Sequence, residues 1–272
     1  YRGGYWDACF VVYMALTLTL IRAFVMRYLL EPLARRLGVR TAGKVERFKE
    51  QGYVFLYYTV SWLSGMYLMY HSPHWFDTKY FWINYPHRDY TWHFKMYYLT
   101  SLAYTLHLIY VIHVEARRKD YVAMFTHHIV TAILLATSYV TNFTRFGNAV
   151  LCMMDLADIL LALAKCLRYA RFQKACDTMF GLFMLAWIYT RFYLYAHVCY
   201  AAYAEGVMYL SPIWDPPRGL FLTLNTPYFF LTLFGALQIL IIYWFALICR
   251  VAVRVITGTG AHDNRSSSED DD

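Results

Sequence analysis

The sequence contains little charge for its length. Only 16% of its 272 residues are Asp, Glu, Lys or Arg, whereas 60% are hydrophobic and 20% are aromatic. Soluble domains carry about 25% charged residues and about 45–50% apolar ones. This composition excludes a disordered chain and disfavours an ordinary soluble domain. It therefore predicts a membrane protein.

A cysteine framework and an initiating methionine are also missing. The six cysteines lie mostly in or beside apolar runs, where a thiol behaves as a small hydrophobic side chain. This placement argues against a disulfide scaffold. The chain starts at Tyr1 rather than at Met, and we expect further residues upstream of it.

Long apolar runs are abundant, and seven of them can cross a membrane. A transmembrane helix needs about 20 mostly apolar residues. The runs show no alternation of period two, which favours helices over a β-barrel. We therefore predict an all-α, polytopic membrane bundle with approximate spans at 8–30, 52–70, 94–114, 121–143, 146–167, 178–203 and 226–249.

Basic residues between the spans are distributed unevenly. The connecting segments on one side hold 15 Lys and Arg residues, against 5 on the other side. Because cytosolic loops carry the excess of positive charge, we predict that the first side, with the C-terminus, is cytosolic. A basic cytosolic face also suits anionic lipid heads or a phosphorylated substrate, although the orientation bias alone accounts for it equally well. The basic segments are 31–51, 115–120, 168–177 and 250–272.

Three regions follow from this layout. Residues 1–44 hold the first span and a cytosolic linker, and residues 45–257 hold the other six spans. Residues 258–272 form a tail that ends in SSSEDDD. A polar, acidic segment of this kind cannot bury apolar surface, so we predict that the tail is disordered.

Ionisable side chains inside the spans are the strongest functional clue. Each costs at least ~2.5–3.5 kcal/mol on insertion, so such groups usually face a bundle interior or a cavity. His127 and His128 lie about 10 Å past the cytosolic edge of the fourth span. Asp155 and Asp158 lie at a similar depth in the fifth span and project from one helical face. A short turn joins these two spans, so we expect the four side chains to form one cluster.

Such a cluster admits three interpretations. A histidine oriented by a carboxylate can act as a general base or as a covalent nucleophile. It can bind a metal, or the polar groups can simply hold two helices together. The metal interpretation is weaker, because the spans hold only one adjacent pair of histidines. We expect the other histidines to be interfacial or packing residues, including His71, His74, His107 and His113.

Arg191 is a further buried charge, in the middle of the sixth span beside Tyr189. A buried guanidinium needs an anionic or aromatic partner. By depth, Asp155 or Asp158 is the expected partner. We favour a structural ion pair of this kind over a direct contact between Arg191 and substrate.

The stretch from Arg117 to Tyr169 carries a composite pattern. It reads RRKDYVAMFTHHIVTAILLATSYVTNFTRFGNAVLCMMDLADILLALAKCLRY, with a basic run, the His pair, an Arg-Phe-Gly turn and then two aspartates. This pattern resembles the Lag motif of ceramide synthases, a branch of the TLC-domain family. Met154, which precedes the first aspartate, resembles the fungal type; many relatives have His there.

The resemblance implies a membrane enzyme of the endoplasmic reticulum. It would transfer a fatty acyl group from acyl-CoA to the amine of a sphingoid base, with spans two to seven enclosing a lipid tunnel. Acyl-CoA is the co-substrate, and no other cofactor or metal is implied. His127 would be the nucleophile or base, and His128 would orient or polarise the reacting groups. Asp155 and Asp158 would set the tautomer and the charge of the histidines.

Further residues outside the His and Asp cluster are expected to contact substrate. The basic residues expected to attract the CoA phosphates are Arg117, Arg118, Lys119 and Lys165, although the first three also serve as an orientation signal. Arg191, Tyr189 and Trp214 are the other candidate substrate-binding residues. Trp214 lies in the loop 205–225, whose position resembles the loop that influences acyl-chain length; a proline-stiffened interfacial loop is an equal alternative.

The resemblance also suggests partners and leaves alternatives. Fungal ceramide synthases associate with a small single-span subunit and with each other, so such a subunit or a dimer is expected, together with membrane lipids and no nucleic acid. One alternative is a non-catalytic TLC-domain protein that binds lipid or associates with the translocon. A second alternative is a metal-dependent membrane lipid hydroxylase.

Overall fold

The chain folds almost entirely into helices. The computed structural model describes residues 1–117 and 119–257. The predictions made for Arg118 and for the tail 258–272 lie outside the described residues. The one departure from an all-α fold in the described part is a short hairpin of two strands, β1 (Ile213–Asp215) and β2 (Leu220–Leu222).

Seven consecutive helical rods make up the described bundle, and each coincides with one predicted span. Two of them contain π-helical turns, at Met26–Leu30 in the first and at Tyr189–Leu194 and Ala201–Glu205 in the sixth. In chain order the helices are α1 (Trp6–Val25) with α2 (Glu31–Arg36), α3 (Ala42–Tyr70), α4 (Trp92–Val114), α5 (Tyr121–Val140), α6 (Thr144–Tyr169), α7 (Gln173–Ile188) with α8 (Tyr195–Tyr200) and α9 (Gly206–Tyr209), and α10 (Thr226–Ile256).

Three of these rods satisfy length and hydropathy criteria for crossing a membrane: Trp6–Arg36, Tyr121–Val140 and Thr226–Arg254. The membrane class is therefore confirmed, while a count of seven spans stays a prediction. The outer face of α1 agrees with lipid contact, because large apolar side chains such as Leu16, Leu20 and Phe24 are 63–72% exposed on it. Apolar surface of that extent is uncommon on a soluble monomer.

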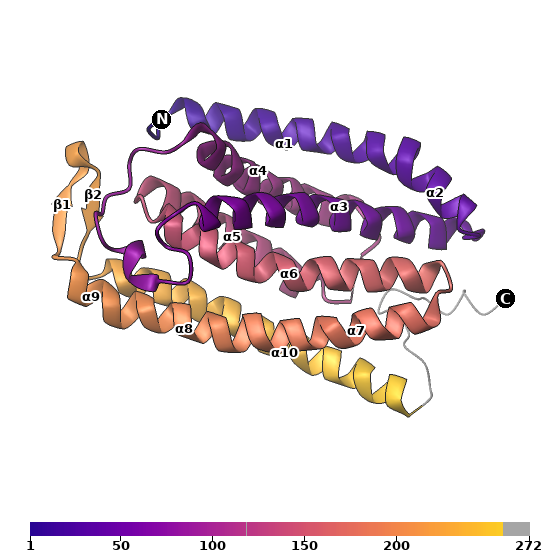
Figure 1. Ribbon diagram of the computed structural model, residues 1–272. Coiled ribbons are helices and arrows are strands. Elements are labelled where there is room, and N and C mark those ends of the chain that lie inside the picture. The colour runs from indigo at the N-terminus through magenta and orange to yellow at the C-terminus, as the bar shows by residue number, and fades with distance from the viewer. Residues whose placement is uncertain (118, 258–272) are drawn as a thin grey trace.

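The rods lie side by side and alternate in direction (Figure 1). The N-terminus, the hairpin β1–β2 and the connecting segment 71–91 lie at one end, which we call the hairpin end. The opposite end, with α2 and the turn between α6 and α7, is the α2 end. Of the basic segments of the predicted cytosolic side, residues 31–51 and 168–177 lie at the α2 end.

Small residues let α6 occupy the centre of the bundle. It packs mainly against α3 and α7, while α4 packs mainly against α1 and α5. A Cβ added to Gly65 of α3 would lie 2.5 Å from the Tyr97 hydroxyl and 2.7 Å from Cys152 Sγ. At Gly147 of α6 a Cβ would collide with the buried Tyr98 ring. Close packing at these two positions thus depends on glycine.

The hairpin is tied to the helical bundle by polar contacts. Gly219 forms its turn with φ +76°, a left-handed conformation that favours glycine. Asn142, in the turn between α5 and α6, donates to the Gly219 carbonyl at 3.0 Å. The backbone N–H of Phe221 donates to the Tyr85 hydroxyl at 3.2 Å. These contacts hold the hairpin over the ends of α5 and α6.

Candidate active site

Two cavities meet inside the bundle. The hairpin-side cavity, of about 420 Å³, lies between α3, α4, α5, α6 and α10 and reaches the hairpin. The α2-side cavity, of about 330 Å³, lies toward the α2 end. The residues that line both cavities mark their junction: Tyr58, Tyr104, Leu108, His127, His128, Asp158, Arg191 and Trp244.

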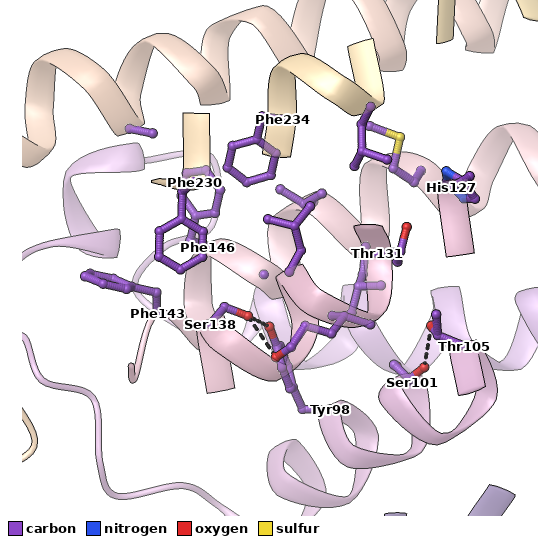
Figure 2. A pocket seen from close by; sticks show the side chains of 18 of the residues that line it. Tyr98, Ser101, Thr105, His127, Thr131, Ser138, Phe143, Phe146, Phe230 and Phe234 are labelled. Carbon is purple, nitrogen blue, oxygen red and sulfur yellow. Dashed lines mark hydrogen bonds between the residues drawn. The ribbon is translucent and has the colours of Figure 1, made fainter. Parts of the chain in front are cut away.

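The hairpin-side cavity is mainly apolar, with a polar wall near the junction. Figure 2 shows Phe143, Phe146, Phe230 and Phe234 gathered around its far part. Hydroxyl groups from α4 and α5 face its near part, and His127 lies beyond them. A long apolar chain is the kind of ligand that such a cavity binds.

The α2-side cavity is rich in charge. Arg22 of α1 pairs with Glu115 at the end of α4, at 2.6 Å between Nη2 and Oε1. Lys165, Arg168 and Asp120 also line this cavity. The α2-side cavity therefore adds charged side chains of both signs to an apolar lining, and it shares the histidine pair with the more apolar hairpin-side cavity.

The two histidines differ in their surroundings. His128 is buried, and its ring centroid lies 5.3 Å from that of His127. The His127 ring stands edge-on to Trp244 of α10, at 5.4 Å between centroids. The Trp244 indole N–H donates to Asp120 Oδ2 at 3.1 Å, so the ring that contacts His127 is itself held in place.

The two carboxylates project from the same face of α6, as their spacing predicts. Both line the hairpin-side cavity. Asp155 is 4% exposed and accepts a hydrogen bond from Ser61 Oγ of α3 at 3.1 Å. Asp158 accepts one from Arg191 Nη2 at 2.8 Å. Each carboxylate thus has its own partner from a neighbouring helix.

Arg191 links α6 to the sixth rod. The predicted ion pair with a carboxylate is confirmed, and its partner is Asp158. The same Nη2 also donates to the Met154 carbonyl at 3.1 Å, and the guanidinium lies 3.9 Å from the Trp187 ring centroid. Arg191 sits in the π-helical turn Tyr189–Leu194, an irregularity that often occurs at functional sites.

Comparison with known proteins identifies the family of this bundle. The family model described as the TLC domain matches residues 47–250. The chain belongs to the TLC-domain family. The first rod, α1 with α2, lies outside the TLC domain, yet it contributes Arg22 to the α2-side cavity.

Named relatives cover the whole chain. It is 38% identical to sphingosine N-acyltransferase lag1 of Schizosaccharomyces pombe over 100% of this chain and 70% of that protein. It is 37% identical to ceramide synthase FUM18 of Gibberella moniliformis, again over 100% of this chain and 70% of the relative. Against ceramide synthase LAG1 of Saccharomyces cerevisiae the identity is 33%, over 100% and 67%. The resemblance first seen in the Lag-like stretch thus extends over the whole chain.

The TLC domain brings together most of the predicted site residues. His127, His128, Asp155, Asp158 and Arg191 all line the hairpin-side cavity. Lys165 lines the α2-side cavity together with the two histidines. Residues separated by more than sixty positions in the sequence therefore converge on one region.

Other predicted residues lie away from both cavities. The Arg117 guanidinium lies 4.8 Å from the Tyr121 ring centroid, and both Arg117 and Lys119 are exposed. Tyr189 is 54% exposed and stacks on Tyr193. Trp214 is 64% exposed on the hairpin and contacts Phe221. None of these four lines either cavity.

Sequence reasoning missed several residues that complete the site. Ser61 holds Asp155, and Trp244 contacts His127. Serine and tryptophan are ordinary inside membrane helices, so neither carries a signal in the sequence. Both come from rods distant in the chain from the Lag-like stretch, and only the fold places them beside it.

The metal alternative gains no support from the geometry. Among residues 1–117 and 119–257, no group of three or more His, Cys, Asp or Glu side chains is arranged to hold a metal ion. Metal analysis of the purified protein tests the hydroxylase alternative directly.

Proposed function

We propose that this protein is a ceramide synthase that transfers a fatty acyl group from acyl-CoA to the amine of a sphingoid base. The observation that carries the proposal is the His127–His128 pair at the junction of a charged cavity and an apolar one. Similarity to proteins named sphingosine N-acyltransferase and ceramide synthase over the whole chain supports it.

The two cavities suit the two parts of an acyl-CoA. The α2-side cavity has Arg22, Lys165 and Arg168 in its lining, and basic side chains attract phosphates. The hairpin-side cavity has an apolar and aromatic lining that suits a lipid chain. With the CoA moiety toward the α2 end and the chain toward the hairpin, the thioester would lie at the histidines.

The net chemistry is one acyl transfer, from the thioester sulfur to the amine nitrogen, and one proton transfer, from the amine to the leaving thiolate. An acyl-imidazole route divides the acyl transfer into two steps, of which the first breaks the C–S bond and the second breaks the bond between the acyl carbon and the imidazole nitrogen. In the proposal, His127 either removes a proton from the attacking amine or first takes the acyl group as an acyl-imidazole. The new bond forms between the amine nitrogen and the acyl carbon, the C–S bond breaks, and the amine proton goes to the CoA thiolate. His128, Asp155 and Asp158 would orient the reacting imidazole and balance its charge.

The membrane arrangement forms part of this proposal. The seven rods would cross the endoplasmic-reticulum membrane, with the basic α2 end and the C-terminus in the cytosol, where acyl-CoA is available. The hairpin-side cavity would serve as the lipid tunnel within spans two to seven. A small single-span subunit or a second synthase chain would pack outside this bundle.

Replacement of each histidine by Ala tests the proposal. Membranes that contain the variant are assayed for acyl-CoA-dependent formation of ceramide from a sphingoid base. We expect His127→Ala to lower the rate by at least about 100-fold, because loss of a general base typically costs 10²–10⁴. His113→Ala is a matched control, since His113 is exposed and bonds to the Ile109 carbonyl of its own helix.

Two outcomes would contradict the proposal. If His127→Ala and His128→Ala both keep the wild-type rate, the histidine mechanism is wrong. If the wild-type protein makes no ceramide but binds the sphingoid base, the alternative of a non-catalytic lipid-binding TLC protein is correct.

A further inference from the structure

We propose that the hairpin-side cavity contains a hydroxyl-binding subsite, formed by Thr131, Ser101 and Thr105, that recognises a hydroxyl group on a lipid substrate. This inference rests on the proposed acyl transfer and adds a determinant of substrate choice. Ser101 and Thr105 belong to α4 and lie outside the Lag-like stretch from Arg117 to Tyr169.

Thr131 has a buried hydroxyl without a partner. Its Oγ1 is inaccessible to solvent and makes no hydrogen bond within the described structure, although the residue lines the cavity. Leaving a buried hydroxyl without a hydrogen-bond partner is unfavourable. A ligand that supplies a hydrogen-bond partner at this point would remove that cost.

Two hydroxyls about two turns further along α5 have partners. Thr137 donates to the Ile133 carbonyl at 2.6 Å. Ser138 pairs with the Tyr98 hydroxyl at 2.5 Å. Thr131 therefore differs from its helical neighbours in having no partner while it faces the cavity.

Ser101 and Thr105 supply acceptors on the facing helix. Ser101 donates to the Tyr97 carbonyl at 2.9 Å, and Thr105 donates to the Ser101 carbonyl at 3.0 Å. Their protons are thus used within α4. The Ser101 side chain also hydrogen-bonds the Tyr57 side chain, so its oxygen has one lone pair left to accept, while the lone pairs of Thr105 Oγ1 remain available. Both residues are buried and line the same cavity. A ligand hydroxyl could donate to one of them and accept from Thr131.

The subsite lies one helical turn from the reaction centre. Thr131 follows His127 by four residues, so the two lie on one face of α5, separated by about 6 Å along the axis. In Figure 2 Thr131 lies between His127 and the Ser101–Thr105 turn, on the side of the cavity away from the phenylalanines. A hydroxyl held there would belong to a carbon close to the reacting atoms.

Two lipid substrates carry a hydroxyl in that position. In a sphingoid base the hydroxyl-bearing carbons adjoin the amino carbon. In a fatty acyl group hydroxylated at the carbon next to the carbonyl, the hydroxyl adjoins the reacting carbon instead. The chemistry of recognition is the same for both, and substrates that lack one hydroxyl at a time distinguish them.

The test uses Thr131→Val, which removes the hydroxyl and keeps the shape, beside Thr131→Ser, which keeps the hydroxyl. Thr137→Val is the control for a threonine on the same helix outside the cavity. For each variant, kcat/KM is measured with a hydroxylated and a deoxy sphingoid base, and with a plain and a hydroxylated acyl-CoA. We expect Thr131→Val to lower kcat/KM roughly 10-fold only for the substrate whose hydroxyl is recognised, as loss of one hydrogen bond predicts.

The outcomes separate the subsite from the proposed function. A selective loss with the base assigns the hydroxyl to the sphingoid base, and a selective loss with the acyl-CoA assigns it to the acyl chain. Equal effects of Thr131→Val on hydroxylated and deoxy substrates would overturn the subsite. If the wild-type protein is inactive, the acyl-transfer proposal fails. The subsite is then tested by binding of the hydroxylated and deoxy bases to the same variants, measured as a shift in the midpoint of thermal unfolding.

Discussion

Arg191 is the buried cation that pairs with one of the two carboxylates of α6. It is 5% exposed and is the guanidinium that pairs with Asp158. Asp155, one turn away, has the Ser61 hydroxyl as its partner instead of a cation. The cluster holds two carboxylates and one guanidinium, and the guanidinium pairs with only one of the two carboxylates.

Replacement of Arg191 by Met tests this pairing. We expect the free energy of unfolding to fall by about 2–3 kcal/mol. This is a small loss for a broken buried ion pair, because the Asp158 side chain is 33% exposed and water can partly solvate it. The double variant Arg191→Met with Asp158→Leu should recover part of the loss, since no unpaired carboxylate then remains at that position. Thermal unfolding in detergent measures both. A double variant less stable than the sum of the two single variants would contradict the pairing.

Trp244 is the residue that positions His127 from outside the Lag-like stretch. Trp244→Leu removes the edge-on aromatic contact, which is worth about 0.5–1.5 kcal/mol. We expect kcat to fall roughly 3- to 10-fold with KM little changed, because the contact acts on the histidine and not on the substrate chain. Trp244→Phe keeps an aromatic ring but loses the hydrogen bond to Asp120. Its kcat should lie between that of the wild type and that of Trp244→Leu. Equal loss of kcat in the two variants would contradict a role for the ring.

At the scale of elements, helix approach is controlled by residue size. α6 packs closely against α3 beside Gly65, and Gly147 of α6 leaves room for the Tyr98 side chain, which extends from α4. The cavity walls are α3, α4, α5, α6 and α10, so a change in helix spacing would alter the cavity itself. The sixth rod brings Arg191 to α6 through a π-helical turn.

Gly147→Ala tests whether the space beside Gly147 is needed for the Tyr98 side chain. The new methyl group would collide with the Tyr98 side chain, and overpacking of this kind costs about 1–3 kcal/mol. We expect a lower midpoint of thermal unfolding and a weaker catalytic rate. Gly181→Ala in α7 is the matched control, since nothing lies within 4 Å of its added Cβ, and it should be neutral or slightly stabilising. Equal destabilisation by the two variants would show that the space beside Gly147 is not the cause.

At the scale of the whole molecule, the connecting segment 71–91 joins α3 to α4 and contacts the hairpin, α6 and the N-terminus. The Tyr1 amino group donates to the Tyr90 carbonyl at 2.8 Å. His74 is 1% exposed and bonds to Asn148 of α6 at 3.1 Å. His87 bonds to the Phe81 carbonyl at 3.2 Å. This end of the bundle therefore contains one buried histidine, His74, and one half-buried histidine, His87.

Burial lowers the pKa of His74 and of His87 to about 4. In the unfolded chain each would titrate near its ordinary value of about 6.5. Between these values the unfolded state binds more protons, so the free energy of unfolding falls as the pH falls from about 6.5 toward 4, by up to about 1.4 kcal/mol per pH unit for each histidine.

Thermal unfolding of the wild-type protein and of His74→Gln between pH 7 and pH 4.5 measures this effect. The variant keeps a hydrogen-bonding side chain without the titration, so its loss of stability on acidification should be smaller. His93→Gln, at an exposed position beside α4, should behave as the wild type. Parallel pH curves for His74→Gln and the wild type would contradict the prediction.

Much of the helical layout could be predicted from composition and apolar run length. Six of the seven predicted spans lie within one helical rod, and the span predicted at 121–143 runs three residues past the end of α5 at Val140. About twenty apolar residues leave few alternatives to a helix in a membrane. The depth argument correctly brought His127 and Asp158 to one cavity junction, since rise per residue is constant along a helix. The hairpin β1–β2 was not predicted, because its two short strands lie in a loop that carries no alternating pattern.

By itself, the sequence determined the membrane class, the seven helical rods and the resemblance to the Lag motif, because all three depend on residues close together in the chain. The tertiary structure decided which rods are neighbours, and therefore which side chains meet. Only it places Ser61 on Asp155, Trp244 on His127 and Arg191 on Asp158. These contacts join residues 33 to 117 positions apart, and such pairings depend on helix packing, which no local pattern specifies.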